Sequence, residues 1–206
     1  MLRSIFIAGT ILMLASTPLA QAGKYNPVLS IGDKAPAWKD LPGIDGKRHS
    51  LSELKNAEAI VLVFTCNSCP YAIDYEERLI ALTKKFADSK VSVVAVNVNK
   101  IPEDNFEAMR ERAKTQGFNF TYLFDETQQI AKDYGATYTP EFFVLDRQRK
   151  IAYMGALDDS PNAKKVKVQH VATALTQLLA NKQPALKETI AIGCRIRMER
   201  PRRKPK

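Results

Sequence analysis

Two cysteines separated by two residues offer the clearest chemistry in this 206-residue chain. Cys66 and Cys69 follow the apolar run 59–64, which is typical of a buried strand, and they precede an amphipathic helix. A pair in that position is expected to expose its first sulfur at a helix N-terminus, where unpaired N–H groups and the helix dipole favour the thiolate. Because the thiolate is the form that attacks disulfides and peroxides, the spacing predicts redox chemistry.

Alternating strands and helices surround this pair. The sequence predicts strands at 59–64, 91–98, 120–124, 141–145 and 151–154, and helices at 70–87, 102–116, 127–134 and 166–179. The first strand is apolar throughout, as expected of a strand that is buried on both faces of a sheet. Strands that alternate with helices, followed by a hairpin and a last helix, predict an α/β fold with a central sheet between layers of helices.

The first 22 residues have the pattern of an export signal. Arg3 supplies a positive start, residues 5–14 are mostly apolar, and Ala20-Gln21-Ala22 fits a small-x-small cleavage site. The apolar part is shorter than the about 20 residues that a membrane-spanning helix needs, so we expect cleavage rather than anchoring. The mature chain then divides into a domain, 23–190, and a basic tail with a third cysteine, 191–206. We expect a periplasmic location and no membrane span beyond the signal.

The formal charge of +9 is concentrated in the tail. Residues 195–206 hold seven Lys and Arg residues against one acidic residue, Glu199, which leaves the domain close to neutral. This distribution does not indicate a nucleic-acid-binding face, and we expect no nucleic-acid partner. The tail is expected to be a solvated, disordered end rather than a lipid-binding segment.

Further motifs accompany the cysteine pair. They are Cys-Asn-x-Cys-Pro-Tyr at 66–71, Leu-Phe-Asp-Glu-Thr-Gln at 123–128, Thr-Pro at 139–140 and Ile-Gly-Cys at 192–194. With them, the chain resembles the thioredoxin-like superfamily from about Ile31 to Met198, and within it the peroxiredoxin-like redoxins (the AhpC/TSA and TlpA-like branches). The resemblance implies a thioredoxin fold with an added strand and helix between 91 and 126. It also implies a cis Pro140 beside the cysteines, with the preceding backbone free to pair with an extended substrate.

The resemblance also implies the roles of the residues at the site. Cys66 is the expected nucleophile and Cys69 the buried resolving thiol in dithiol–disulfide exchange with protein or small-molecule substrates, with a thiol as electron donor. The redox group is the Cys66–Cys69 disulfide itself, so no organic cofactor and no metal are expected. The supporting positions are Thr65, Asn67, Ser68, Pro70, Thr139 and Pro140.

Three other interpretations of the pair remain open. A thiol peroxidase would place the peroxide-reacting sulfur at Cys69 or Cys66, but Leu62 and Cys66 stand where the peroxiredoxin pattern Pro-x-x-x-Thr-x-x-Cys has Pro and Thr. A copper-binding module would need a histidine, and neither His49 nor His170 lies in the loop before residue 142. The third interpretation is an inert disulfide.

The third cysteine and the proton donor are less defined. Cys194 is either an unpaired thiol or a redox partner that folds back on Cys66 or Cys69. Many thioredoxin-like proteins bury a carboxylate six positions before the first cysteine, and that position is Ile60 here. Glu141 and Asp74 are substitutes by location, and we expect both to be solvated surface carboxylates.

Overall fold

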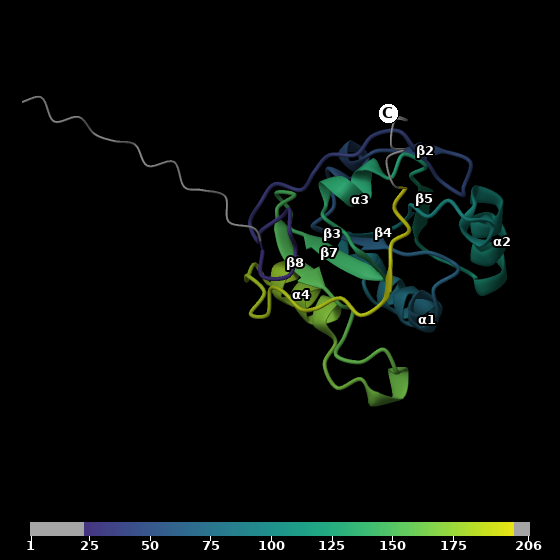
Figure 1. Ribbon diagram of the computed structural model, residues 1–206. Helices are drawn as coiled ribbons and strands as arrows, with labels where there is room; N and C mark the ends of the chain where they lie inside the picture. The colour runs from purple at the N-terminus through teal and green to yellow at the C-terminus, as the bar shows by residue number, and fades with distance from the viewer. Residues whose placement is uncertain (1–22, 200–206) are drawn as a thin grey trace, which may run out of the picture.

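The computed structural model describes residues 23–199. The predicted export signal, 1–22, and residues 200–206 of the tail lie outside the described residues. A five-stranded sheet forms the centre of the domain, with strand order β5-β4-β3-β7-β8 (Figure 1). The strands are β3 (Ala59–Phe64), β4 (Val91–Asn97), β5 (Thr121–Phe124), β7 (Glu141–Leu145) and β8 (Ile151–Gly155).

The sheet is mixed. Strands β3, β4 and β5 run parallel, whereas β7 pairs antiparallel with both β3 and β8. Every residue of β3 is buried, which agrees with the continuous apolar run that predicted it. The central position of β3 places its carboxyl end, and the cysteine pair that follows, in the middle of the sheet edge.

Helices cover both faces of the sheet (Figure 1). They are α1 (Pro70–Lys85), α2 (Phe106–Gln116), α3 (Gln129–Asp133) and α4 (His170–Leu179). Successive residues of a strand point to opposite faces. Val61 and Val63 therefore pack against α1, α2 and α4, while Ile60 and Leu62 pack against α3 and the N-terminal segment.

Two predicted helices begin four residues later than the sequence pattern indicates. Residues 102–104 form a short 3₁₀ turn, η3 (Pro102–Asp104), and α2 starts only after Asn105, whose side chain accepts a hydrogen bond from the Ala108 N–H and caps the helix. The last helix starts at His170 rather than at 166: Val166 has an extended backbone after the 3₁₀ turn η4 (Ala163–Lys165), and Val168 is exposed.

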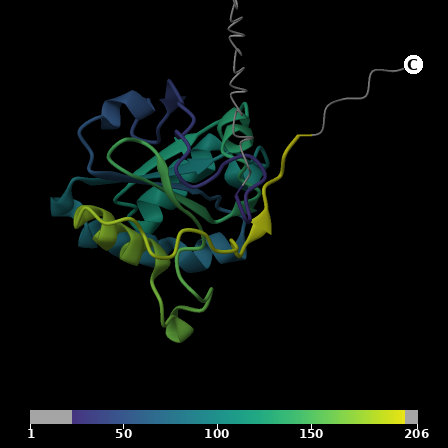
Figure 2. The ribbon, with the colours of Figure 1, turned by 90° about the vertical axis from the view of Figure 1, so that its left-hand side faces the viewer.

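The C-terminal segment returns to the domain. Strand β9 (Cys194–Arg195) pairs antiparallel with β6 (Tyr138–Thr139), and a further small ladder joins β1 (Leu41–Pro42) to β2 (Arg48–His49). The yellow segment in Figures 1 and 2 leaves α4 and runs across the molecule before it reaches β9. Ile196 is buried in the core on the α3 face. The prediction of a solvated, disordered end is therefore wrong for Ile196 and for the ordered backbone of residues 195–199, although Arg195, Arg197 and Glu199 are exposed as expected.

The helices of the described part, 23–199, were also compared with the length and hydropathy of a membrane span. None of them is long and apolar enough to cross a bilayer.

Candidate active site

The cysteine pair lies between the end of β3 and the start of α1. The Thr65 N–H bonds to the Val96 carbonyl at 2.9 Å and so extends the ladder between β3 and β4 by one residue. Cys66 follows at once, Cys69 is the N-cap residue of α1, and Pro70 is the first helical residue. The end of the buried strand therefore positions Cys66, and the start of the helix positions Cys69.

Thr139 contacts both sulfurs. Its hydroxyl oxygen lies 3.4 Å from the Cys66 sulfur, and its carbonyl accepts a hydrogen bond from the Cys69 thiol at 3.0 Å. The Thr139–Pro140 peptide is cis, which confirms the expectation for Pro140. Strand β7 brings this loop to the pair, because it runs antiparallel to β3 with Glu141 opposite Phe64.

Neither sulfur is open to solvent. Cys66 is 3% exposed and Cys69 is 2% exposed, so the expectation of an exposed first sulfur is wrong. The two cysteines form a small apolar cluster with Ala72, and Cys194 packs against that cluster. The sequence pattern did not reveal this cover, because it comes from a segment more than 120 residues further along the chain.

The backbone before Pro140 is also occupied. Cys194 is paired with Thr139 in the β6–β9 ladder, and the Ile196 N–H bonds to the Thr137 carbonyl at 2.9 Å. The approach is so close at Gly193 that a Cβ there would overlap the Thr139 carbonyl oxygen. The expectation that this backbone is free for a substrate is therefore wrong for the arrangement seen here.

The pKa values of the three cysteines depend on one another. The Cys69 sulfur, and then burial, raise the pKa of the Cys66 thiol. The Cys66 thiol lowers the pKa of Cys69, and the Cys194 thiol and the N–H groups of Ala72 and Cys194 act in the same direction. The helix start therefore acts on Cys69, its N-cap, rather than on Cys66 as expected from the sequence. The Thr139 carbonyl accepts the hydrogen bond of the Cys69 thiol and so favours its protonated form.

A buried aspartate that the sequence analysis missed organises the loop between the cysteines. One carboxylate oxygen of Asp104, in η3, accepts the N–H groups of Asn67 and Ser68 at 2.8 Å each. The other accepts the Ser68 hydroxyl at 2.6 Å and the Asn99 amide at 2.9 Å. The negative charge of Asp104 also raises the pKa of Cys66. Its only sequence signal is a turn-forming Pro-Glu-Asp-Asn run after a strand, which gives no sign of burial.

The two carboxylates suggested by the sequence lie elsewhere. Glu141 is buried, contrary to the expectation, and one of its oxygens accepts the N–H groups of Thr137 and Tyr138 at 2.8 and 2.9 Å. Burial raises the pKa of Glu141. Asp74 is exposed on α1, as expected. The Glu141 side chain therefore supports the loop before Pro140 by accepting two of the loop's backbone N–H groups.

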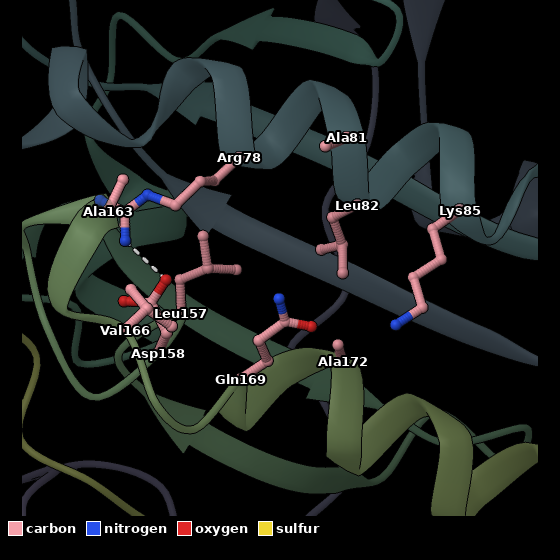
Figure 3. Close-up of a pocket in the computed structure, with 10 residues that line it drawn as sticks. All are labelled: Arg78, Ala81, Leu82, Lys85, Leu157, Asp158, Ala163, Val166, Gln169 and Ala172. Carbon is pink, nitrogen blue, oxygen red and sulfur yellow. Dashed lines mark hydrogen bonds and ion pairs between the residues drawn. The ribbon is translucent and has the colours of Figure 1, made fainter.

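Two cavities differ in their relation to the sulfurs. A void of about 10 Å³ borders Cys66 and Pro140, and its lining includes the aromatic residues Tyr75, Phe118, Phe120, Tyr122 and Phe142. That space is about enough for one water molecule. A cavity of about 300 Å³ lies between α1 and α4, where Arg78 and Asp158 form an ion pair at 2.5 Å (Figure 3). No cysteine lines that larger cavity.

The histidines lie away from the cysteines. His49 is within 3.3 Å of Asp45 and Glu53, and His170 begins α4 beside Tyr153. Across residues 23–199, no group of three or more His, Cys, Asp or Glu side chains is placed so that it could hold a metal ion.

A cysteine pair at a helix start, a cis-proline loop against it and a mixed sheet between helices define a thioredoxin-like redoxin. The chain belongs to the AhpC/TSA family, which matches residues 31–154. Membership of this oxidoreductase family and the α/β architecture confirm the family and the fold expected from the sequence.

Known proteins resemble most of the chain. The thiol-disulfide oxidoreductase ResA of Geobacillus thermodenitrificans is 25% identical over 153 residues, 73% of this chain and 83% of that protein. A crystal structure of an uncharacterised conserved protein from Geobacillus kaustophilus has 35% identity and a TM-score of 0.79, over 84% of this chain and 95% of that one. That of a putative thiol:disulfide interchange protein DsbE from Chlorobium tepidum has 25% identity and a TM-score of 0.58, over 74% and 97%.

Proposed function

We propose that this protein is a thiol–disulfide oxidoreductase that exchanges dithiol for disulfide at Cys66 and Cys69. The observation that carries the proposal is the placement of Cys66 and Cys69 in one small buried cluster, with Thr139 in contact with both sulfurs. Such a pair can close into a disulfide and reopen without any other group. Two of the similar proteins carry thiol–disulfide exchange in their names, which supports the same reaction here.

The reaction follows from these contacts. The Cys66 thiolate attacks one sulfur of a substrate disulfide, forms a mixed disulfide and expels the other sulfur as a thiolate, which takes up a proton. The Cys69 thiolate then attacks the Cys66 sulfur, closes the Cys66–Cys69 disulfide and releases the second substrate thiolate, which is protonated in turn. The substrate gains two electrons and two protons, and the protein loses both. A thiol donor reverses these steps on the protein.

Cys66 is the sulfur assigned to the first attack because of its surroundings. It borders the void beside Pro140, and the neighbouring Asn67 and Ser68 are only half-buried. Because its pKa is raised, the attack requires that its proton pass to a neighbouring group, and Cys69 packs beside it. The buried Cys69 then acts as the resolving thiol, as proposed from the sequence.

The test is insulin reduction in the presence of dithiothreitol. The wild-type protein should accelerate insulin precipitation, and Cys66→Ser should lower the rate to background. Cys69→Ser should stop after the first step, so that reaction with 5,5′-dithiobis(2-nitrobenzoate) leaves one stable mixed disulfide on Cys66. A surface variant, Ser52→Ala, serves as the matched control and should keep the wild-type rate. Full activity of Cys66→Ser would refute the assignment of the first attack.

Peroxide reduction is a second candidate, because the helix start and two thiols act together on Cys69. The Cys69 thiolate would attack the O–O bond, forming a sulfenic acid and releasing an alcohol or water, and a neighbouring thiol would close a disulfide with loss of water. Consumption of hydrogen peroxide with dithiothreitol, faster than insulin reduction and abolished by Cys69→Ser, would favour this reaction over exchange. Titration with copper(I) tests the copper-binding alternative in the same preparation.

We further propose that the protein works after export. The support is the leader pattern at residues 1–22, whose cleavage site precedes Gly23. Expression of the full chain should give a periplasmic protein whose N-terminal residue is Gly23. Retention of Met1 or recovery from the cytoplasmic fraction would contradict the proposal.

A further inference from the structure

We propose that Cys194 is a third redox thiol. It attacks Cys69 in the Cys66–Cys69 disulfide and forms a Cys69–Cys194 disulfide, and strand β9 holds it in position for this attack. This inference rests on the exchange proposed above and extends it. The site then holds a relay of three sulfurs, with Cys69 in the middle.

The order of the relay follows from the contacts. Cys194 packs against the cluster that Cys66 and Cys69 form with Ala72, and the thiols of Cys66 and Cys194 both lower the pKa of Cys69. The contacts of the Cys66 sulfur are instead with Cys69, Thr139 and Ser68. Thiol–disulfide exchange requires the attacking sulfur to reach a sulfur of the existing disulfide. Cys194 reaches Cys69, so Cys69 is the sulfur through which exchange can pass.

The segment that carries Cys194 is held along its length. We call residues 192–199 the C-terminal strap. Its start is fixed by the β6–β9 ladder and by the close approach of Gly193 to the Thr139 carbonyl. Further along, the Arg197 N–H bonds to the side-chain oxygen of Asn99 at 3.0 Å, and the Arg197 carbonyl accepts from the Gln128 amide at 2.9 Å.

The side chains that hydrogen-bond to the strap belong to the interior of the domain. Asn99 and Gln128 are both buried. Gln128 also donates to the Val98 carbonyl at 2.7 Å and accepts the Glu199 N–H at 2.7 Å. Buried polar groups cost free energy unless they are paired, so losing the strap leaves two amides short of partners. The strap is therefore a docked part of the fold, and Cys194 is delivered to Cys69 in a defined position.

The strap is also linked to the loop between the first two cysteines. Asn99, which accepts the strap N–H, donates to Asp104, and Asp104 accepts the N–H groups of Asn67 and Ser68. The strap and the Cys66–Cys69 loop therefore share one buried hydrogen-bond network. Movement of either one alters the partners available to the other.

The transfer step is balanced within the protein. In the oxidised protein, the Cys194 thiol loses its proton to water and the thiolate attacks the Cys69 sulfur. The Cys66–Cys69 bond breaks, the Cys69–Cys194 bond forms, and Cys66 leaves as a thiolate that takes up a proton. The protein has the same number of electrons before and after. Cys66 is again available for a substrate disulfide, while the second disulfide ties the strap to the pair.

Peptide mapping tests the relay directly. The purified protein is oxidised with glutathione disulfide at low concentration, its thiols are blocked with N-ethylmaleimide, and it is digested with trypsin without reduction. Cleavage after Lys and Arg places Cys66 and Cys69 in peptide 56–78 and Cys194 in peptide 188–195. The relay predicts two products, an internally bonded 56–78 and a cross-link of 56–78 to 188–195 with N-ethylmaleimide on Cys66. Detection of the internally bonded peptide alone would overturn the relay.

Two single-thiol deletions separate the relay from the proposed function. Cys66→Ser should lose insulin reduction yet form the Cys69–Cys194 disulfide, whereas the matched variant Cys69→Ser should leave Cys66 and Cys194 unlinked. Circular dichroism checks that both variants fold. If folded Cys66→Ser keeps two alkylatable thiols while wild type forms Cys66–Cys69, the relay fails and the function stands. If wild type forms only Cys69–Cys194 and does not reduce insulin, the proposed function fails instead.

A backbone variant tests the docking without removing a thiol. Gly193→Ala places a methyl group against the Thr139 carbonyl and should displace the strap. We expect Cys194 in the reduced protein to be alkylated roughly tenfold faster than in wild type, equivalent to about 1.4 kcal/mol of docking free energy. The Cys69–Cys194 product should fall accordingly. Ile190→Ala, at an exposed position before the strap, is the control. An unchanged alkylation rate in Gly193→Ala would contradict the docked strap.

Discussion

Cys194 lies directly opposite Thr139 in the β6–β9 ladder. Thr139 is also the residue whose hydroxyl and carbonyl groups contact the sulfurs of Cys66 and Cys69. One residue therefore links the C-terminal strap to the reactive pair. Because the strap occupies the backbone beside Pro140, an extended substrate can pair there only after the strap has moved. The same pairing of Thr139 with Cys194 thus limits access to the cysteine pair and fixes the position of Cys194.

The buried charge of Asp104 should control how readily Cys66 ionises. Asp104→Asn removes a negative charge that raises the pKa of Cys66, so that pKa should fall. The pH profile of Cys66 alkylation by iodoacetamide, measured in a background with Cys69 and Cys194 replaced by serine, should shift to lower pH. The same variant should lose about 1–3 kcal/mol of stability, because its amide cannot accept every bond that the carboxylate accepts.

The exposed Asp88 provides the control for this experiment. Asp88→Asn removes the same charge at the surface and should leave the alkylation profile unchanged. A profile for Asp104→Asn that coincides with wild type, or that moves to higher pH, would show that Asp104 has no electrostatic role at Cys66.

Gln128 should stabilise the docked strap. Gln128→Ala removes the amide that bonds to the Arg197 carbonyl and to the Glu199 N–H. We expect a loss of about 1–3 kcal/mol in unfolding free energy and faster alkylation of Cys194, because buried backbone groups lose their partners. Thiol labelling followed by mass spectrometry measures the second effect. The exposed Gln129 is the neighbouring control, and Gln129→Ala should leave the labelling rate unchanged.

Glu141 should make stability depend on pH. Burial raises its pKa in the folded state, so its contribution to stability is fully present below the pKa of the unfolded chain and is lost as pH rises through the folded pKa. Glu141→Gln keeps an oxygen for the Thr137 and Tyr138 N–H groups and removes the buried charge. The variant should be more stable than wild type at pH 8 and equal to it below about pH 4. Urea unfolding at both pH values measures the difference, and a variant less stable at pH 8 would contradict the argument.

The Arg78–Asp158 ion pair should support the fold without affecting exchange. Asp158 is almost fully buried and Arg78 is mostly buried (Figure 3). Asp158→Ala leaves the guanidinium short of its charged partner and should cost about 3 kcal/mol of stability. Insulin reduction by the folded variant should stay at the wild-type rate, because neither residue contacts the cysteine pair. The more exposed pair Arg147–Glu58 is the matched control, and Glu58→Gln should change stability by less than about 1 kcal/mol.

The local features of the site were readable from the sequence. The apolar run before Cys66 became β3 with the same ends, and Pro70 begins α1 as expected. The strand after Pro140 was also anticipated. These features depend on residue type and on periodicity along one segment, so neighbouring residues carry enough information to predict them. The cis peptide before Pro140, in contrast, was expected only from the family resemblance.

The tertiary structure alone decided what surrounds the sulfurs. The burial of Cys66, the position of Cys194 opposite Thr139 and the carboxylate of Asp104 under the loop all join segments that are more than 30 residues apart. Such contacts arise when a sheet and its helices pack, and no local periodicity records them. The spacing of Cys66 and Cys69 was thus enough to predict a redox pair. The groups that cover, charge and reach that pair come from distant segments, and their positions depend on how the apolar faces of those segments pack together, because backbone hydrogen bonds are alike for nearly all residues.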